Sequence, residues 1–186
     1  KTIFISVGSL FDDIVRDSKA SGLNFVFYNG TKMAVKKVCN IPRSTEILFI
    51  SHDGLKGFDV DDLLDWAFET KNGGLELADP KKPSLLVDES HKVVKCSGSG
   101  KSVRAVATYN LLNRGFERGA FVMTLSGTFA CKVADLELNA GILGLCKTLK
   151  TPELCSFDRL KRTCRRLGSC GLEAICGQLR SSGSYC

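Results

Sequence analysis

The chain has 186 residues, which is long enough for one domain that buries its own hydrophobic core. Hydrophobic residues make up 44% of the chain and charged residues 25%, and these values exclude an intrinsically disordered protein. No apolar run approaches the roughly 18 residues that a membrane-spanning helix needs, and the first residues lead into a strand rather than a signal-peptide core. The chain does not begin with Met, so we expect a processed protein or an excised domain.

The cysteine content indicates an oxidising compartment. Nine cysteines are present, and five of them fall within the last 32 residues. We therefore expect disulfide bonds in a secreted or luminal protein, with a cytosolic or viral intracellular protein as the alternative. The odd count leaves one thiol free or pairs it between chains in a linked homodimer. Asn29 begins a glycosylation sequon in an expected turn, which agrees with secretion.

The formal net charge of +6 is concentrated toward the end of the chain. Residues 150–186 carry seven Lys and Arg against three acidic residues. Such a segment favours a polyanionic partner, for example a nucleic acid, although a solvated helix face has the same composition. The candidate polyanion-binding residues are Arg159, Lys161, Arg162, Arg165 and Arg166.

The chain opens with the pattern of a strand followed by a helix. Residues 2–7 are predominantly apolar and are predicted to form a strand. Ser9 is placed to cap a helix that ends at Gly22, because apolar residues then recur at helical spacing. Those apolar positions are Phe11, Ile14 and Val15.

A β-hairpin is predicted next. Residues 23–28 are rich in β-forming residues, and residues 33–39 alternate well enough for a returning strand. Asn29-Gly30 between them is the strongest short hairpin signal. The predicted order up to this point is therefore βαββ.

The same order is predicted a second time. Residues 46–51 form the next strand, and Asp59 caps the clearest helix of the chain, which is expected to end at Gly73. Residues 75–77 and 85–96 supply the two following strands. We therefore expect a mixed sheet made of two βαββ-like units, with an internal duplication as one explanation.

A flexible break at residues 97–100 divides the chain into residues 1–97 and 98–186, which we expect to pack as one domain. Residues 103–112 fit a helix or a strand equally well. Residues 120–125 and 128–133 read as a hairpin that turns at Ser126-Gly127, and the pattern becomes helical from Gly141 onward.

Small polar residues follow both of the early strands. Because the carboxyl ends of strands in an open α/β sheet are where ligands usually bind, these residues are candidates for an anion site near two helix N-termini. A nest of backbone amides at residues 97–100 is a second place for a phosphate or sulfate. The candidate residues are Ser9, His52, Asp53, Ser99, Gly100 and Lys101, although turns and helix caps use the same residue types.

The apolar run at residues 85–87 ends in Asp88-Glu89-Ser90-His91, which resembles the DExH box of helicases. In that family the strand delivers an Asp to magnesium and a Glu to a water, and a phosphate-binding loop lies upstream. Residues 95–102 are similar to such a loop, but they follow the acidic box, and Lys95 stands where the family has its first Gly.

Two arrangements would support a small hydrolase. Cys39 with His91 has a tolerable spacing for a cysteine–histidine pair, and Ser126 with His52 and Asp53 could form a serine triad. The pocket expected at Ser6, His52 and Asp53 is another place for a hydrolase site. A disulfide or core role for Cys39 and a turn role for Ser126 compete with these assignments, so no catalytic residue is assigned.

The last cysteines admit two interpretations. The spacing of the first three resembles the CCCH zinc fingers that bind single-stranded RNA, but Ala174 stands where that family has its His, and the stacking aromatic residues are missing. A fourth cysteine would have to replace the His as the zinc ligand, and disulfide bonds are the other interpretation. The cysteines concerned are Cys155, Cys164, Cys170 and Cys176.

We expect an α/β (α+β) fold with a mixed sheet, a β-hairpin and a cysteine-stapled helical C-terminal segment. The leading functional prediction is a secreted, disulfide-stabilised, non-catalytic protein that binds a partner macromolecule and needs no cofactor. The alternatives are an intracellular protein, of viral or other origin, that binds nucleic acid through the basic Cys-rich C-terminus with or without zinc, and a small hydrolase.

Overall fold

The computed structural model describes residues 1–69, 82–93, 102–126 and 154–168, together with residues 136, 138, 140, 143, 145, 146, 171, 173–175 and 177. Strands and helices alternate through most of this part of the chain. In chain order they are β1 (Thr2–Ser6), α1 (Phe11–Ala20), β2 (Phe27–Asn29), β3 (Ile47–Ser51), α2 (Val60–Phe68), β4 (Ser84–Val87), α3 (Val103–Glu117), β5 (Phe121–Thr124) and α4 (Phe157–Leu167).

The five strands form one sheet in the order β2-β3-β1-β4-β5, and every pair in it is parallel. The register places Ser6 beside Ser51, and Ile5 beside both Ile50 and Val87. The predicted α/β class is confirmed, but the described strands make a parallel sheet where a mixed one was expected. β5 follows the break predicted at residues 97–100 and β4 precedes it, yet both belong to this sheet.

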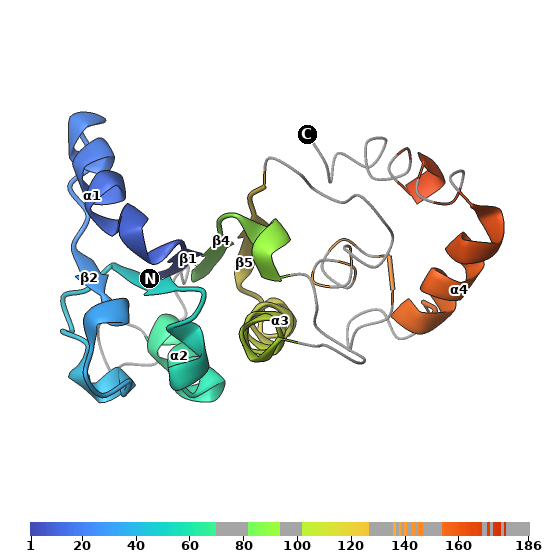
Figure 1. Cartoon of the computed structure of the whole chain (residues 1–186). Helices are drawn as coiled ribbons and strands as arrows, with labels where there is room; N and C mark the ends of the chain where they lie inside the picture. Colours follow the sequence, from blue (N-terminus) through green and yellow to red (C-terminus); the bar gives the residue numbers. More distant parts are fainter. Residues whose placement is uncertain are drawn as a thin grey trace.

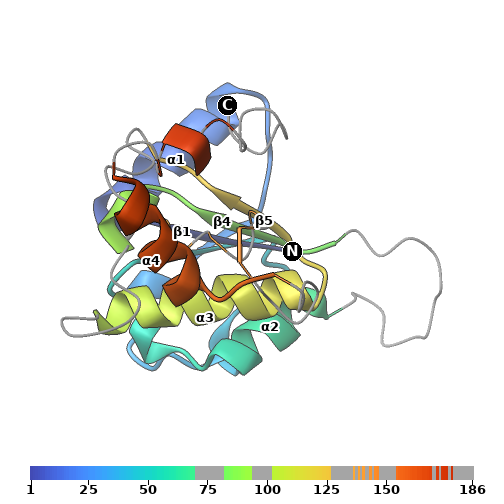
Figure 2. The same cartoon turned by 90° about the vertical axis from the view of Figure 1, so that its right-hand side faces the viewer.

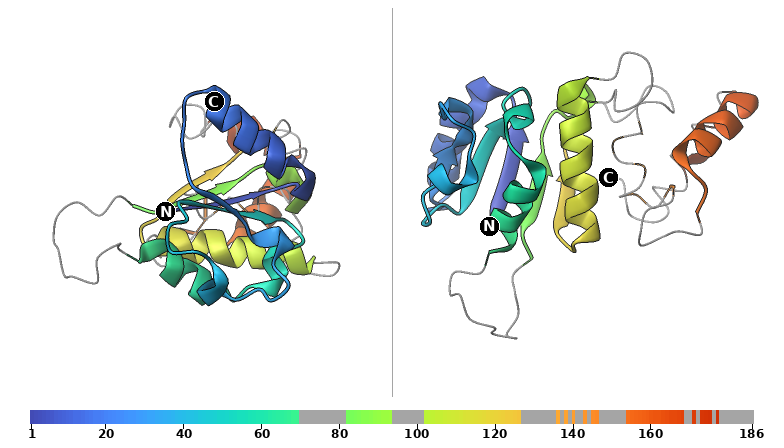
Figure 3. Two further views of the ribbon diagram at one scale, coloured as in Figure 1. Left: turned by 90° about the vertical axis from the view of Figure 1, so that its left-hand side faces the viewer. Right: turned by 90° about the horizontal axis from the view of Figure 1, so that it is seen from below.

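The helices lie on both faces of the sheet. Figures 1, 2 and 3 show α1 on one face, with α2 and α3 side by side on the other. The chain passes from β1 over β3 to β2 in one direction, and from β3 over β1 to β4 in the other. Right-handed crossovers in opposite directions must use opposite faces, which accounts for the placement of the helices.

The main hydrophobic core fills the space between the sheet and α2 and α3. Alternate residues of the strands enter it, because successive side chains of a strand point to opposite faces. Ile3 and Ile5 of β1 are buried there against Leu63 and Leu64 of α2. Near the C-terminal end of α3, Gly115 fits closely, since a Cβ there would lie 2.2 Å from a methyl group of Leu85.

Aromatic residues cover the face that carries α1. The Phe4 and Phe49 rings stack with their centroids 6.0 Å apart, and Phe11 of α1 packs edge-on against Phe49 at 5.3 Å. No residue of α1 is fully buried. This face is therefore covered more thinly than the opposite one.

The predicted helix caps meet different outcomes. Asp59 caps α2 as expected, since its carboxylate accepts hydrogen bonds from the backbone N–H groups of Asp61 and Asp62. Ser9 does not cap α1: it lies within a 3₁₀ turn, and Leu10 precedes the helix without a side-chain cap. The prediction that α2 ends at Gly73 is wrong, because its last helical residue is Phe68.

The hairpin predicted at Asn29-Gly30 is also wrong. The Asn29 side chain accepts a hydrogen bond from the N–H of Thr31 and so begins a 3₁₀ turn. The Lys36 ammonium then donates to the carbonyl oxygens of Gly30 and Thr31. The chain therefore returns to β3 through irregular structure, and β2 pairs with β3 in parallel.

Later predictions are settled in part. The β4 strand ends at Val87, and a 3₁₀ turn at Ser90–Val93 replaces the rest of the strand expected at residues 85–96. Residues 103–112 are helical, within α3. The strands predicted at residues 75–77 and 128–133 lie outside the described residues.

The basic C-terminal region contains the predicted helix α4, shown in Figure 1. Cys164 on its inner side packs with Leu136 and Ile175 in a second, smaller hydrophobic cluster. Among the described residues, the thiols of Cys39, Cys146, Cys155 and Cys164 are free.

Candidate functional site

The chain topology marks the carboxyl end of β1 as a place for a ligand. The segment after β1 leads to α1 on one face of the sheet, whereas the segments after its neighbours β3 and β4 lead to α2 and α3 on the other face (Figure 1). Neighbouring strands whose connections diverge in this way leave a crevice at their carboxyl ends. Three polar residues meet at this edge: Ser6 at the end of β1, His52 after β3 and Asp88 after β4.

The carboxylate of Asp88 is held by hydrogen bonds on both oxygens. The Ser6 hydroxyl donates to Oδ2 at 2.8 Å, and the N–H of Glu89 donates to Oδ1 at 2.9 Å. The Asp88 backbone is fixed as well, because its N–H donates to the carbonyl of Ile5. The orientation of this carboxylate is therefore set before any ligand arrives.

The backbone at Glu89 is strained. Its φ of 51° lies in the left-handed region, and no other residue except glycine has a positive φ in the described ranges. Such a conformation costs a residue with a Cβ about 1 kcal/mol or more, and it persists where the surroundings enforce it. The strain falls on the residue directly after the oriented Asp88 carboxylate.

His91 links Glu89 to the end of the next strand. Its Nδ1 atom lies 3.1 Å from a carboxylate oxygen of Glu89 and 3.0 Å from the hydroxyl oxygen of Ser126. The side chains of Glu89 and His91 are each 38% exposed, so a solute can reach them. The Ser90 N–H donates to the Leu125 carbonyl, and the Leu125 N–H donates to the Val87 carbonyl, so the segments after β4 and β5 are joined at the same place.

His52 is buried beside this group without a polar partner. Only 5% of the residue is exposed, and neither ring nitrogen makes a hydrogen bond. Burial lowers the pKa of His52; the Asp88 carbonyl and carboxylate oppose this shift, while the charges of Arg104 and Lys92 add to it. Since burial is the largest contribution, it favours the neutral form of the His52 imidazole.

Positive charge surrounds the same edge. Arg104 lies in the first turn of α3, with its guanidinium 3.8 Å from the carboxylate of Asp53. Ser102 caps that helix by accepting a hydrogen bond from the N–H of Ala105. The charges of Arg104 and Lys92 act on the His52 imidazole, as that of Asp88 does, so both cations lie near this edge of the sheet.

Three of the six residues predicted for an anion site are described, and they differ in exposure. Ser9 and Asp53 are exposed and His52 is buried. Ser99, Gly100 and Lys101 lie outside the described residues, so that part of the prediction is not placed.

The hydrolase arrangements are not formed. His91 contacts Glu89 and Ser126, whereas Cys39 contacts Asn40 on an exposed turn before β3. The Ser6 hydroxyl is fully buried and donates to Asp88, and His52 does not bond to it.

The predicted zinc ligands are partly placed. Burial, together with the charge of a Cys155 thiolate, raises the pKa of the Cys146 thiol to about 11. The same two causes raise the pKa of Cys164, so Cys155 lies near both thiols. Cys170 and Cys176 lie outside the described ranges, and within those ranges no three His, Cys, Asp or Glu residues are grouped to hold a metal ion.

The other predicted surface sites lie on two separate elements. Asn29, the predicted glycosylation site, is half-buried at the end of β2. On α4, Lys161 forms an ion pair with Asp158 at 3.2 Å. The remaining predicted polyanion-binding residues of α4 are exposed: Arg159, Arg162, Arg165 and Arg166.

The sequence reveals the DExH-like segment around Asp88 but not the residues from other strands that contact it. Ser6 contacts Asp88 across 82 positions of sequence, and no local pattern signals such a contact. The strain at Glu89 was equally invisible, because Glu is not a residue that predicts a positive φ.

No protein-family model matches this chain, and no curated protein is significantly similar to it. In the part of the chain with a described structure, no helix has the length and apolar character to cross a bilayer.

Proposed function

We propose that this chain is a nucleoside-triphosphate hydrolase of the DExH type, with its acidic box at Asp88, Glu89 and His91. The observation that carries the proposal is the oriented Asp88 carboxylate at the carboxyl end of a central parallel strand, followed at once by the strained Glu89. The resemblance of residues 85–91 to the DExH box implies an apolar strand that delivers these two carboxylates. The β4 strand does so in this fold.

Asp88 is suited to the magnesium ion that accompanies the nucleotide substrate. Magnesium keeps several waters and the phosphate oxygens in its shell, so one or two protein carboxylates are sufficient. Both oxygens of Asp88 already accept one hydrogen bond each, which leaves lone pairs on an aligned carboxylate. The Ser6 hydroxyl is a positioning group in this proposal.

Glu89 is suited to orient the attacking water. In phosphoryl transfer the protein contributes positioning and charge stabilisation, and a carboxylate near the γ-phosphate orients the nucleophile. His91 holds the Glu89 carboxylate at 3.1 Å and connects it to Ser126. Binding of the nucleotide at the end of β4 would thereby be coupled to the position of the segment that follows β5.

The charges at this edge agree with a polyphosphate ligand. Arg104, in the first turn of α3, and Lys92 both act on the His52 imidazole, as Asp88 does, so positive charge lies near this edge. Phosphate oxygens bind at helix N-termini and to guanidinium groups, because both supply N–H donors and positive potential.

The test uses Mn²⁺–ATP as the probe and water-proton relaxation as the measure of binding. We expect saturable binding by the unaltered chain and binding at least about tenfold weaker in Asp88→Asn, because a charged ligand is lost. Glu89→Gln should keep the binding and lose phosphate release. Asp12→Asn, which removes an exposed carboxylate on α1, is the matched control and should bind normally.

Two outcomes contradict the proposal. One is no binding of Mn²⁺–ATP by the unaltered chain. The other is equal binding by the unaltered chain and Asp88→Asn, which would place the metal elsewhere.

We also propose that α4 binds a polyanion such as a nucleic acid. Four arginines of α4 are exposed and form no ion pair within the described residues, whereas Cys164 and Leu160 on its other side pack against the smaller hydrophobic cluster. An unneutralised arginine face on a helix that is anchored by its opposite side favours contact with phosphates. This role is compatible with the nucleotide hydrolase and does not depend on it.

A further inference from the structure

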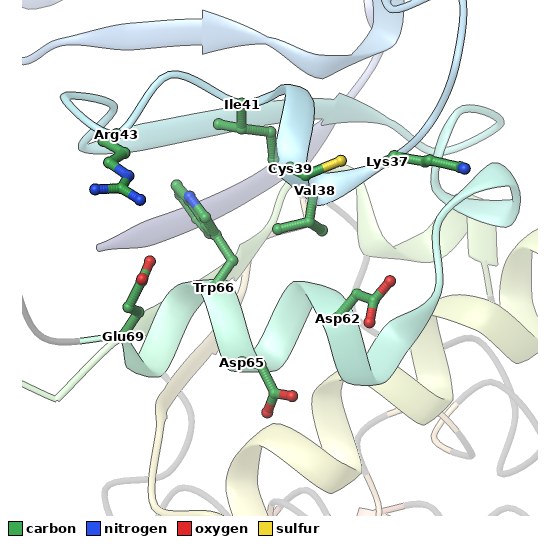
Figure 4. Close-up of a pocket in the computed structure, with 9 residues that line it drawn as sticks. All are labelled: Lys37, Val38, Cys39, Ile41, Arg43, Asp62, Asp65, Trp66 and Glu69. Atoms are coloured by element: carbon green, nitrogen blue, oxygen red, sulfur yellow. The ribbon is translucent and has the colours of Figure 1, made fainter. Parts of the chain in front are cut away.

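A pocket of about 750 Å³ lies on the outer side of α2, away from the carboxyl edge of the sheet. One wall is the helix, and the other is the segment of residues 37–43 that leads into β3 (Figure 4). Val38 and Ile41 give this pocket an apolar wall opposite Trp66. Its volume is in the range that accommodates small organic ligands.

The indole of Trp66 supplies an unused hydrogen-bond donor in this pocket. Trp66 is only 5% exposed, and its Nε1–H has no acceptor. Figure 4 shows the indole rising from α2 toward Ile41 and Arg43. A buried donor without an acceptor costs free energy, and a ligand oxygen would remove that cost.

The Trp66 indole cannot move away easily. The Lys1 ammonium donates to the backbone carbonyl of Trp66 at 3.0 Å and lies over the indole ring at 4.7 Å from its centroid. The donor is therefore held in place on the wall of the pocket.

The charges that remain unpaired in the pocket favour an anion. Glu69 pairs with Lys1 at 3.1 Å, and Asp65 pairs with Arg118 at 2.9 Å. Asp62 is then the one lining carboxylate outside an ion pair in the described part of the chain, against two unpaired cations, Lys37 and Arg43. The pocket therefore carries an excess of one positive charge.

We infer that this pocket binds a small organic monocarboxylate. The carboxylate would accept hydrogen bonds from Trp66 Nε1 and the Arg43 guanidinium, which Figure 4 shows at the same end of the pocket. The apolar body of the ligand would lie along Val38 and Ile41. A single carboxylate satisfies the orphan donor and balances the excess charge in one step.

This site is independent of the proposed nucleotide site. Lys1 precedes β1 and contacts the last turn of α2, so this end of the pocket lies toward the amino edge of the sheet. Asp88 and Glu89 lie at the opposite edge, and loss of either site leaves the other intact.

Trp66 is the only tryptophan of the chain, so its fluorescence reports on this pocket alone. The probe is hexanoate, with hexanamide as a neutral ligand of the same length. We expect hexanoate to shift the emission with saturation, hexanamide to do so at least about tenfold more weakly, and Arg43→Gln to weaken hexanoate binding by a similar factor. Lys19→Gln, which removes an exposed cation on α1, is the matched control and should bind normally.

A second variant tests the indole donor itself. Trp66→Phe keeps an aromatic ring but has no N–H group, and ligand-detected NMR replaces fluorescence as the readout. Hexanoate binding should weaken about tenfold. Equal binding of hexanoate and hexanamide, or unchanged hexanoate binding in both Arg43→Gln and Trp66→Phe, would overturn the inference.

Discussion

The Ser6 hydroxyl lies 2.8 Å from a carboxylate oxygen of Asp88 and joins the carboxyl ends of β1 and β4. The two residues in this contact differ in their exposure to solvent. Ser6 is completely buried, whereas Asp88 is only partly so. A core hydroxyl thus orients a carboxylate that solvent reaches.

Replacing Ser6 by Ala should destabilise the fold, because the partly buried Asp88 carboxylate loses a hydrogen-bond donor. A hydrogen bond to a charged group contributes about 1.5–3 kcal/mol. Urea unfolding should therefore show a lower midpoint at an unchanged denaturant slope. Ser9→Ala is the control, since Ser9 is exposed and caps no helix. Equal stability of the two variants would show that the contact contributes nothing.

Replacing Glu89 by Gly should stabilise the chain while it removes the carboxylate. Glycine adopts a φ of 51° without steric cost, so relief of strain is expected to contribute about 1 kcal/mol. The variant should unfold at a higher temperature and release no phosphate. Glu89→Gln keeps the strain and separates the two effects. If both variants unfold at the same temperature, Glu89 stores no strain.

The stability should depend on pH through His52. Its pKa in the folded state is lowered from the ordinary value of 6.5, so the unfolded chain binds the proton more readily. The contribution of His52 is fully present above pH 6.5 and is lost as the pH falls through the lowered pKa, by up to about 1.4 kcal/mol for each pH unit in that interval.

Urea midpoints of the unaltered chain and His52→Gln, measured from pH 7.5 down to pH 5, test this dependence. The difference in free energy of unfolding between the two proteins should shrink as the pH falls. A difference that stays constant would mean that His52 titrates as it does in the unfolded chain.

Binding through α4 should be sensitive to salt and to its arginines. Replacing Arg162, Arg165 and Arg166 by Ala should abolish retention on a heparin column at low salt, because each phosphate or sulfate contact releases counterions. A triple Ala variant at the exposed residues Lys19, Lys32 and Lys56 removes the same charge elsewhere and should be retained. Equal loss of retention in both variants would indicate that net charge alone causes binding. Full retention of the α4 variant would show that α4 is not the binding surface.

Patterns of neighbouring residues in the sequence correctly predicted several strands and one helix cap. The apolar runs of β1 and β3 and the Asp59 cap of α2 form as expected. The DExH-like segment is recognisable for the same reason, since its residues are contiguous. The prediction of a secreted, disulfide-stabilised binding protein stays a prediction.

Non-local contacts decided the remainder. Asn29-Gly30 is a strong hairpin signal, but β2 pairs with β3 in parallel, and the Asn29 side chain caps a turn instead. The same limit applies to the candidate site, where Ser6 was grouped with His52 and Asp53 and not with Asp88. Its role depends on the position of β4 beside β1, which the pattern of either strand alone does not contain.

The position of β1 also has a consequence for the order of folding. Of the five described strands β1 comes first in the chain, yet it lies at the centre of the sheet and pairs with strands that begin at Ile47 and Ser84. During translation β1 has no neighbour until β3 has left the ribosome, and its second edge stays open until β4 follows. Long-range parallel pairing of this kind folds slowly and exposes an apolar strand meanwhile, so newly made chains are expected to need chaperone protection until β4 is in place.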